Sequence, residues 1–133
     1  MRSYPHNRQY VLPFPALEIS LRASDDSPAI GALSALVDTG ADITLVPLSL
    51  LEQIEAPELD EVRLRSHWGH ATTVTTYLVN IELSTGVLPG LEVVGDLHAG
   101  EIVLGRDVLN RLLLLIDGPR QLTDILLRRP RAN

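Results

Sequence analysis

Residues 35–47 read ALVDTGADITLVP, a run of apolar residues that is interrupted by a carboxylate and a glycine. The apolar parts predict two short strands, at 30–37 and 43–46, with Asp38 at the end of the first strand. Gly40 allows the backbone of the intervening turn to approach its neighbours closely. A carboxylate between apolar strands has to be paired, hydrogen-bonded or partly neutralised, which is typical of functional sites. Asp38 is therefore the candidate catalytic residue; as an alternative, it only caps the turn.

The composition is that of one globular domain and excludes several kinds of chemistry. The chain has 133 residues, with 17 acidic side chains and 11 basic ones that are all Arg, and it contains no Cys. Without Lys or Cys there is no Schiff-base or P-loop lysine, no thiolate nucleophile and no Cys-ligated metal. We expect a single domain over 1–133, with an N-terminal extension at 1–9 and a basic C-terminal tail at 127–133.

Charge and hydropathy limit the partners. The net charge of −6 argues against a nucleic-acid partner, because binding to phosphates requires a basic face. The longest apolar run, Leu112–Ile116, is far short of the about 20 residues that cross a membrane. The first ten residues contain no apolar segment of the kind found in signal peptides, so we expect a cytoplasmic protein without a membrane partner.

Outward from the central stretch, short elements alternate with turns. Leu17, Ile19 and Leu21 alternate with polar residues and predict a strand that is buried on one face. A long hairpin is expected from the alternation at 62–65 and 77–84, with its tip at Ser66–His70. Further strands are expected at 10–12, 91–97, 101–104, 112–116 and 121–126, and short helices at 48–54 and 105–111. The pattern predicts a mainly β domain.

Two of these segments resemble the motifs of a known family. The run Asp38-Thr39-Gly40-Ala41-Asp42 resembles the active-site signature of the aspartic proteases, and Ile102–Leu109 is similar to the segment before the helix of retroviral-type, single-domain members. The hairpin lies between them, where that family carries its flap. The resemblance runs from about Leu17 to Ile125. It implies a closed retropepsin-like β-barrel with a flap hairpin and one or two short helices, assembled as a homodimer.

The resemblance also implies an aspartic endopeptidase. Peptide hydrolysis needs both a base and an acid, whereas this chain carries a single Asp-Thr-Gly motif. A C2 homodimer, in which each copy supplies Asp38, is the simplest source of a carboxylate pair sharing one proton. No cofactor is expected. The alternatives are a non-catalytic module of the same fold that binds peptides or mediates dimerisation, and a processing domain of a larger precursor, against which the initial Met argues.

Supporting roles follow from the same resemblance. Thr39 is expected to bond across the two-fold axis, and the amide of Gly40 to serve the carboxylate pair. Asp42 and Arg106 are expected to form a bidentate ion pair, with two independent surface charges as the alternative.

The hairpin tip is expected to cover the substrate through Trp68, Gly69 and His70, with Trp68 either stacking on the peptide or packing back on the hairpin. His67 and His70 are better explained as solvated side chains than as metal ligands, so no metal is predicted.

The substrate is expected to be an extended apolar segment of a peptide or protein. Apolar walls are expected from Val46, Trp68, Leu97 and Val103.

The strands at Tyr10–Leu12 and Gln121–Leu126 are candidates for the dimer interface, since retroviral relatives interleave their chain ends there.

Overall fold

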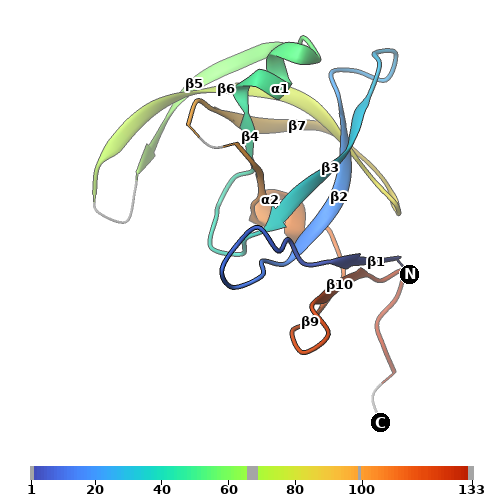
Figure 1. Cartoon of the computed structure of the whole chain (residues 1–133). Coiled ribbons are helices and arrows are strands. Elements are labelled where there is room, and N and C mark those ends of the chain that lie inside the picture. The colour runs from blue at the N-terminus through green and yellow to red at the C-terminus, as the bar shows by residue number, and fades with distance from the viewer. Residues whose placement is uncertain (1, 66–68, 99, 132–133) are drawn as a thin grey trace.

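The computed structural model describes residues 2–65, 69–98 and 100–131, which form a β-barrel, a small second sheet and two short helices (Figure 1). The mainly β fold predicted from the sequence is confirmed. The elements are β1 (Arg2–Pro5), β2 (Ala16–Arg22), β3 (Ile30–Val37), β4 (Leu45–Pro47), α1 (Leu48–Gln53), β5 (Glu58–Arg65), β6 (Ala71–Leu83), β7 (Gly86–Asp96), β8 (Ile102–Leu104), α2 (Arg106–Leu109), β9 (Leu114–Asp117) and β10 (Leu122–Ile125).

The larger sheet closes on itself. Its strand order is β2-β3-β8-β4-β7-β6-β5, and the additional pairing of β2 with β6 turns six of these strands into a barrel. An ion pair lies at this seam, because Arg22 on β2 donates from Nε to Glu82 on β6 at 2.7 Å. Closure removes the free edges that an open sheet of these six strands would present, and β5 remains an edge strand outside the barrel.

The alternation read from the sequence builds the barrel wall. Leu17, Ile19 and Leu21 on β2 are buried, whereas Glu18 between them is exposed. The end of β3 departs from this alternation, since Ala35–Val37 is buried at each residue. Here β3 pairs with β2 along one edge and with β8 along the other, and its side chains are buried on both faces. The strand that leads to Asp38 is therefore anchored in the core.

A three-stranded antiparallel sheet, in the order β1-β10-β9, lies below the barrel (Figure 1). The predicted strand at Tyr10–Leu12 is wrong: these residues form a loop that is closed by a bridge between Asn7 and Phe14. Its residues have no partner strand, and the ring of Tyr10 packs on that of Phe14 with centroids 5.4 Å apart. The N-terminal strand of the fold is β1, which lies within the stretch expected to be an extension.

The hairpin of β5 and β6 projects from the barrel (Figure 1). β6 continues from the hairpin into the barrel wall, where it pairs with β7 from Thr76 onward. Both helices are short, and neither of them has the length of a membrane-spanning helix in the described part of the chain.

Candidate active site

Asp38 stands directly after β3, on a turn at the surface of the barrel. Its backbone amide donates to the carbonyl of Leu104 on β8 at 3.1 Å, which continues the β3–β8 pairing by one residue. Its side-chain Oδ1 accepts a hydrogen bond from the amide of Gly40 at 2.9 Å. Asp38 is half-buried, whereas Thr39 and Gly40 are exposed. The carboxylate is therefore held in one orientation, with the tip of the turn open to an approaching molecule.

A side chain at position 40 would crowd this carboxylate. A Cβ atom built on Gly40 would lie 3.1 Å from Asp38 Oδ1, closer than nine in ten real Cβ contacts. Glycine thus allows the amide of residue 40 to reach the carboxylate, in agreement with the close approach predicted from the sequence.

Arg106, the first residue of α2, ties the turn to the downstream motif. Its guanidinium donates from Nη1 to the carbonyl of Thr39 at 2.7 Å and from Nη2 to Oδ1 of Asp42. Its backbone amide donates to the carbonyl of Ala41 at 2.8 Å. The structure thus brings together Asp42 and Arg106, as predicted, although the guanidinium divides its donors between a carboxylate and a carbonyl and is not bidentate on Asp42.

A second link, which the sequence analysis missed, joins Thr44 to Asp107. The hydroxyl of Thr44 donates to Asp107 Oδ1 at 2.8 Å and accepts from the amide of Gly105 at 3.1 Å. The amide of Thr44 donates to Asp107 Oδ2 at 3.1 Å. Thr44 is fully buried, so these bonds satisfy polar groups that have no access to water. The available signal was Thr44 itself, a polar residue inside the apolar run 43–46.

Gly105 makes this close packing possible. A Cβ atom on Gly105 would lie 2.8 Å from the carbonyl carbon of Ile43 and 3.0 Å from the carbonyl oxygen of Ala41. Any side chain at position 105 would therefore push the Asp38 turn away from α2.

A groove of about 330 Å³ lies between the hairpin and the strands that follow the turn. Leu45 and Leu97 line it, and the hairpin contributes Leu64 and Val74. Val46 does not contribute to the wall as expected, because it is fully buried in the core. The reason is the alternation of β4, which turns Leu45 toward the groove and Val46 away from it. The complete lining is Leu45, Leu48, Leu64, Thr72, Thr73, Val74, Thr75, Tyr77, Val94, Gly95, Asp96, Leu97 and His98.

Tyr77 forms part of this groove and packs against Gly95. A Cβ atom on Gly95 would lie 2.6 Å from Cε1 of Tyr77, so the ring occupies the space of the missing side chain. Burial raises the pKa of the Tyr77 hydroxyl, and the nearby carboxylates of Glu58 and Glu52 raise it further. The ring is thus a neutral, largely apolar surface.

The structure describes only part of the hairpin tip that was expected to cover the substrate. His67 and Trp68 lie outside the described residues, so the two alternatives for Trp68 remain predictions. Gly69 has φ +83°, a left-handed conformation that favours glycine, and His70 is exposed. No group of three potential metal-ligating side chains occurs within residues 2–65, 69–98 and 100–131.

Comparison with known proteins identifies the family. A family model described as gag-polyprotein putative aspartyl protease matches residues 31–111, more than half of the chain and including both motifs. No curated protein sequence matches significantly.

Two solved structures share the fold. EIAV protease complexed with the inhibitor HBY-793 matches with a TM-score of 0.57 and 19% identity, covering 77% of this chain and 91% of that chain. A retropepsin-like aspartic protease from Rickettsia conorii matches with a TM-score of 0.60 and 15% identity, covering 93% of this chain and 88% of that chain. The chain therefore belongs to the family of gag-polyprotein aspartyl proteases, and it is a retropepsin-like peptide hydrolase.

Proposed function

We propose that this protein is an endopeptidase that acts as a homodimer, with Asp38 of each copy forming the carboxylate pair. The observation that carries the proposal is the Asp38 turn: a carboxylate oriented by the Gly40 amide, on a turn whose tip is exposed. One carboxylate cannot act as base and acid in the same step, and the described residues contain no second Asp-Thr-Gly turn. A second copy supplies the missing group.

The chemistry follows from two carboxylates about 3 Å apart, which share one proton because both cannot ionise cheaply. The ionised carboxylate takes a proton from a bound water, whose oxygen forms a bond to the scissile carbonyl carbon. The protonated carboxyl gives its proton to the carbonyl oxygen, which yields a neutral diol. The carbon–nitrogen bond then breaks as the first carboxyl gives its proton to the amine nitrogen, while the second carboxylate takes a proton from a diol hydroxyl, which leaves a carboxylic acid and restores the pair. No covalent enzyme intermediate forms.

The neighbouring residues position this pair. Thr39 lies at the exposed tip and bonds across the two-fold axis to the partner's turn. Gly40 keeps the carboxylate in orientation through its amide. Arg106 fixes the turn from behind by holding the carbonyl of Thr39 and the side chain of Asp42. All four act on Asp38 through the conformation of residues 38–42.

The substrate is an extended peptide that lies between the turn and the hairpin. The groove of about 330 Å³ offers walls of leucine, valine and the Tyr77 ring, and it therefore accepts apolar side chains. Gly69 and His70 cover the peptide beside the hairpin tip. This arrangement places the reacting carboxylate on a rigid turn and the contacts to substrate on a projecting hairpin.

The substitution Asp38→Asn tests the chemistry, with Asp26→Asn as a matched control in the exposed turn after β2. We expect Asp38→Asn to remain folded and to cleave no member of a peptide library between about pH 4 and 7. Asp26→Asn should retain the wild-type rate, and pepstatin should inhibit it. Cleavage by Asp38→Asn would remove the carboxylate pair from the mechanism. Peptide binding without cleavage by the wild-type protein would favour the non-catalytic module.

A cross-linking experiment tests whether the two turns meet. The chain contains no Cys, so a single cysteine placed at Thr39 can form a disulfide only with a second copy. A disulfide requires Cα atoms roughly 4.4–6.8 Å apart, and Thr39→Cys should therefore cross-link rapidly under mild oxidation. Ser84→Cys, at an exposed turn between β6 and β7, is the control and should stay monomeric on denaturing gels. Equal cross-linking of both variants would contradict the proposed axis.

A further inference from the structure

The charges of the chain are divided between two parts of the fold. The small sheet and its connections, residues 2–9 and 110–131, carry seven arginines and two aspartates, a net charge of +5. Residues 10–109, which include the barrel and the hairpin, carry four arginines and fifteen acidic side chains, a net charge of −11. In Figure 1 the small sheet lies below the barrel, whereas the hairpin projects from its upper part. The overall charge of −6 thus combines a basic end, residues 2–9 and 110–131, with an acidic barrel.

The positive charges of the basic end are not neutralised within the chain. Its arginines are all exposed, and the ion pairs within residues 2–65, 69–98 and 100–131 lie elsewhere, at the barrel seam and behind the Asp38 turn. Of its two aspartates, Asp124 accepts a hydrogen bond from the hydroxyl of Ser3. Asp117 accepts one from the backbone amide of Arg120. The exposed arginines are Arg2, Arg8, Arg111, Arg120, Arg128, Arg129 and Arg131.

Apolar side chains are exposed among these arginines. A hollow of about 720 Å³ is formed by Leu115 together with the segment 126–131. Leu126 and Leu127 line it, and Leu127 is 77% exposed. The segment is tied to the sheet, because the amide of Leu126 donates to the carbonyl of Leu113 at 2.8 Å. The apolar surface is therefore presented by a fixed part of the chain.

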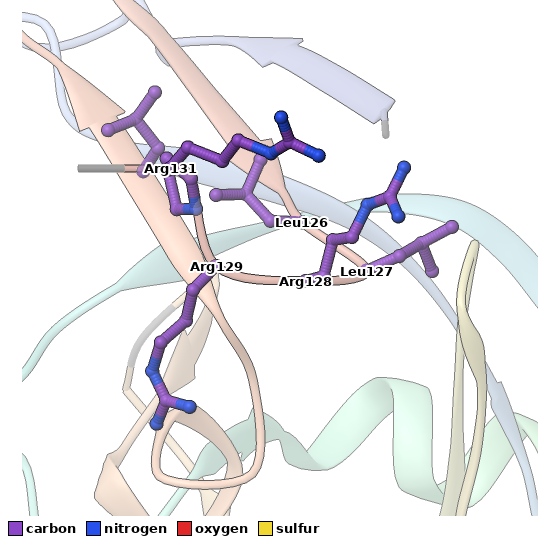
Figure 2. Close-up of a pocket in the computed structure, with 7 residues that line it drawn as sticks. Leu126, Leu127, Arg128, Arg129 and Arg131 are labelled. Carbon is purple, nitrogen blue, oxygen red and sulfur yellow. The ribbon is translucent and has the colours of Figure 1, made fainter. Parts of the chain in front are cut away.

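Arginines flank this hollow on both sides. Figure 2 shows the guanidinium groups of Arg128 and Arg131 on one side of the segment 126–131 and that of Arg129 on the other. A guanidinium can stay among polar groups while its own stem and a neighbouring leucine contact an apolar phase. Cations next to exposed aliphatic side chains are the combination that binds the interface of an anionic lipid bilayer.

We propose that the basic end binds the surface of a bilayer that contains anionic lipids, with Leu127 inserted among the headgroups and the arginines on the lipid phosphates. The division of charge orients the molecule, because the same surface attracts the basic end and repels the acidic barrel. Such peripheral binding needs no membrane-spanning segment. It departs from the expectation of no membrane partner, which considered only spans and signal peptides. It does not depend on the homodimer of the proposed function.

The side chains of the basic end favour a lipid surface over a nucleic acid. Proteins that bind single strands stack the bases on exposed aromatic rings. Residues 110–131 contain no aromatic residue, and Tyr4, on β1, is buried. Exposed leucines gain nothing from a sugar–phosphate backbone, whereas they lose contact with water in a bilayer.

Co-sedimentation with lipid vesicles tests the proposal. The wild-type protein should bind vesicles of phosphatidylcholine and phosphatidylserine at least about tenfold more tightly than vesicles of phosphatidylcholine alone, and added salt should weaken the binding. Combined Arg128→Gln and Arg129→Gln substitutions should weaken it about tenfold or more. The matched control is Arg63→Gln with Arg65→Gln, which removes the same charge from exposed positions on β5 and should leave binding unchanged. Equal losses for the two double variants would overturn the proposal.

The apolar contribution is tested separately. Leu127→Ser should weaken binding to the phosphatidylserine vesicles by about fivefold. Its control is Leu59→Ser on β5, because Leu59 is 47% exposed and lies outside the basic end; this variant should bind as the wild type does. If inorganic phosphate released the wild-type protein far better than chloride at equal ionic strength, a site for a single phosphate would replace the proposed surface.

Two other results would assign the basic end to a different partner. Binding of a single-stranded RNA oligonucleotide through Arg128 and Arg129, without binding to vesicles, would favour a nucleic acid. A raised dimer dissociation constant of the Arg128→Gln, Arg129→Gln variant in ultracentrifugation, with unchanged vesicle binding, would make the segment a contact between copies. We expect this variant to cleave soluble peptides at the wild-type rate, so that loss of vesicle binding is distinct from failure of the proposed function.

Discussion

The Asp38 turn and the β5–β6 hairpin both connect strands of the barrel, but they are held in different ways. The turn is bonded to a segment more than 60 residues away, through Arg106 to Thr39 and Asp42 and through Asp107 to Thr44. The hairpin is held by the pairing of its own two strands, from Glu58–Tyr77 to Arg65–Ala71. Its base is also joined to β7 at Thr76 and Tyr77, whereas from Glu61–Thr75 to Arg65–Ala71 β5 and β6 pair with each other.

Under the proposed function, the Asp38 turn carries the chemical step and the β5–β6 hairpin contacts the substrate. Groups that transfer protons need fixed positions, and the turn provides them through bonds to a distant segment. Under the same proposal, the hairpin supplies the surface that contacts the peptide side chains, and its described residues are held mainly by the pairing of β5 with β6. Substitutions that loosen the turn should lower kcat, whereas substitutions in the hairpin wall should raise KM.

The largest effect is expected for Asp107→Ala. The change leaves the buried amide and hydroxyl of Thr44 without an acceptor and should lower the free energy of unfolding by about 2–4 kcal/mol. Urea denaturation measures this loss. The control is Asp60→Ala, whose exposed carboxylate accepts from the amide of Glu61, and which should cost less than about 1 kcal/mol. Similar losses for both variants would show that the turn is not held more firmly than the hairpin base.

Arg106→Ala should separate activity from stability. Its ion pair with Asp42 is exposed and contributes little to folding, about 0–1 kcal/mol, but the carbonyl of Thr39 loses its donor. We expect kcat to decrease roughly tenfold or more, because small displacements of a reacting group are costly. Arg22→Ala removes the ion pair with Glu82 at the barrel seam and should leave kcat unchanged. If Arg106→Ala kept both the wild-type dimer and the wild-type rate, the positioning role would be refuted.

Leu64→Ala tests the hairpin side of the comparison. Leu64 lines the groove, and its truncation should raise KM by about tenfold for peptides with a large apolar side chain and change kcat little. Leu59→Ala, on the same strand but outside the groove lining, is the control. Steady-state kinetics with a graded series of peptides provides both constants. A fall in kcat without a change in KM would place the hairpin in the chemical step.

Tyr77→Phe should have the smallest effect, confined to alkaline pH. The folded protein raises the pKa of Tyr77 above its ordinary value of 10.0, so the folded state keeps this proton longer than the unfolded chain. The associated stability is fully present below the unfolded pKa and is lost as the pH rises through the raised folded value. Denaturation at a series of pH values should show that the wild type loses stability relative to Tyr77→Phe above about pH 10. Parallel curves for the two proteins would argue against burial of the hydroxyl.

The sequence predicts the turn well because its determinants are local. An apolar run, an Asp and a Gly within six residues specify a strand, a carboxylate and a close approach of backbone, and each of these is found. The link from Thr44 to Asp107 was missed because it depends on which residues the barrel brings together. Periodicity cannot show that a buried hydroxyl at position 44 meets a carboxylate at position 107.

The small sheet was predicted less well for a related reason. The strand expected at Tyr10–Leu12 is a loop, and β1 at Arg2–Pro5 was missed because four residues carry too little alternation to be recognised. Its strand character comes from pairing with β10, more than 115 residues away in the chain. Edge strands of this length are specified by their partners and not by their own composition.

β6 divides at Thr76 into a part that belongs to the hairpin and a part that belongs to the barrel. Before this residue the strand pairs with β5, and from it onward it pairs with β7. The buried hydroxyl of Thr76 lies 2.8 Å from a carboxylate oxygen of Glu92 and 3.2 Å from the carbonyl oxygen of Asp60. Thr76 thus lies where the hairpin joins the barrel, and its hydroxyl contacts both β5, through Asp60, and β7, through Glu92.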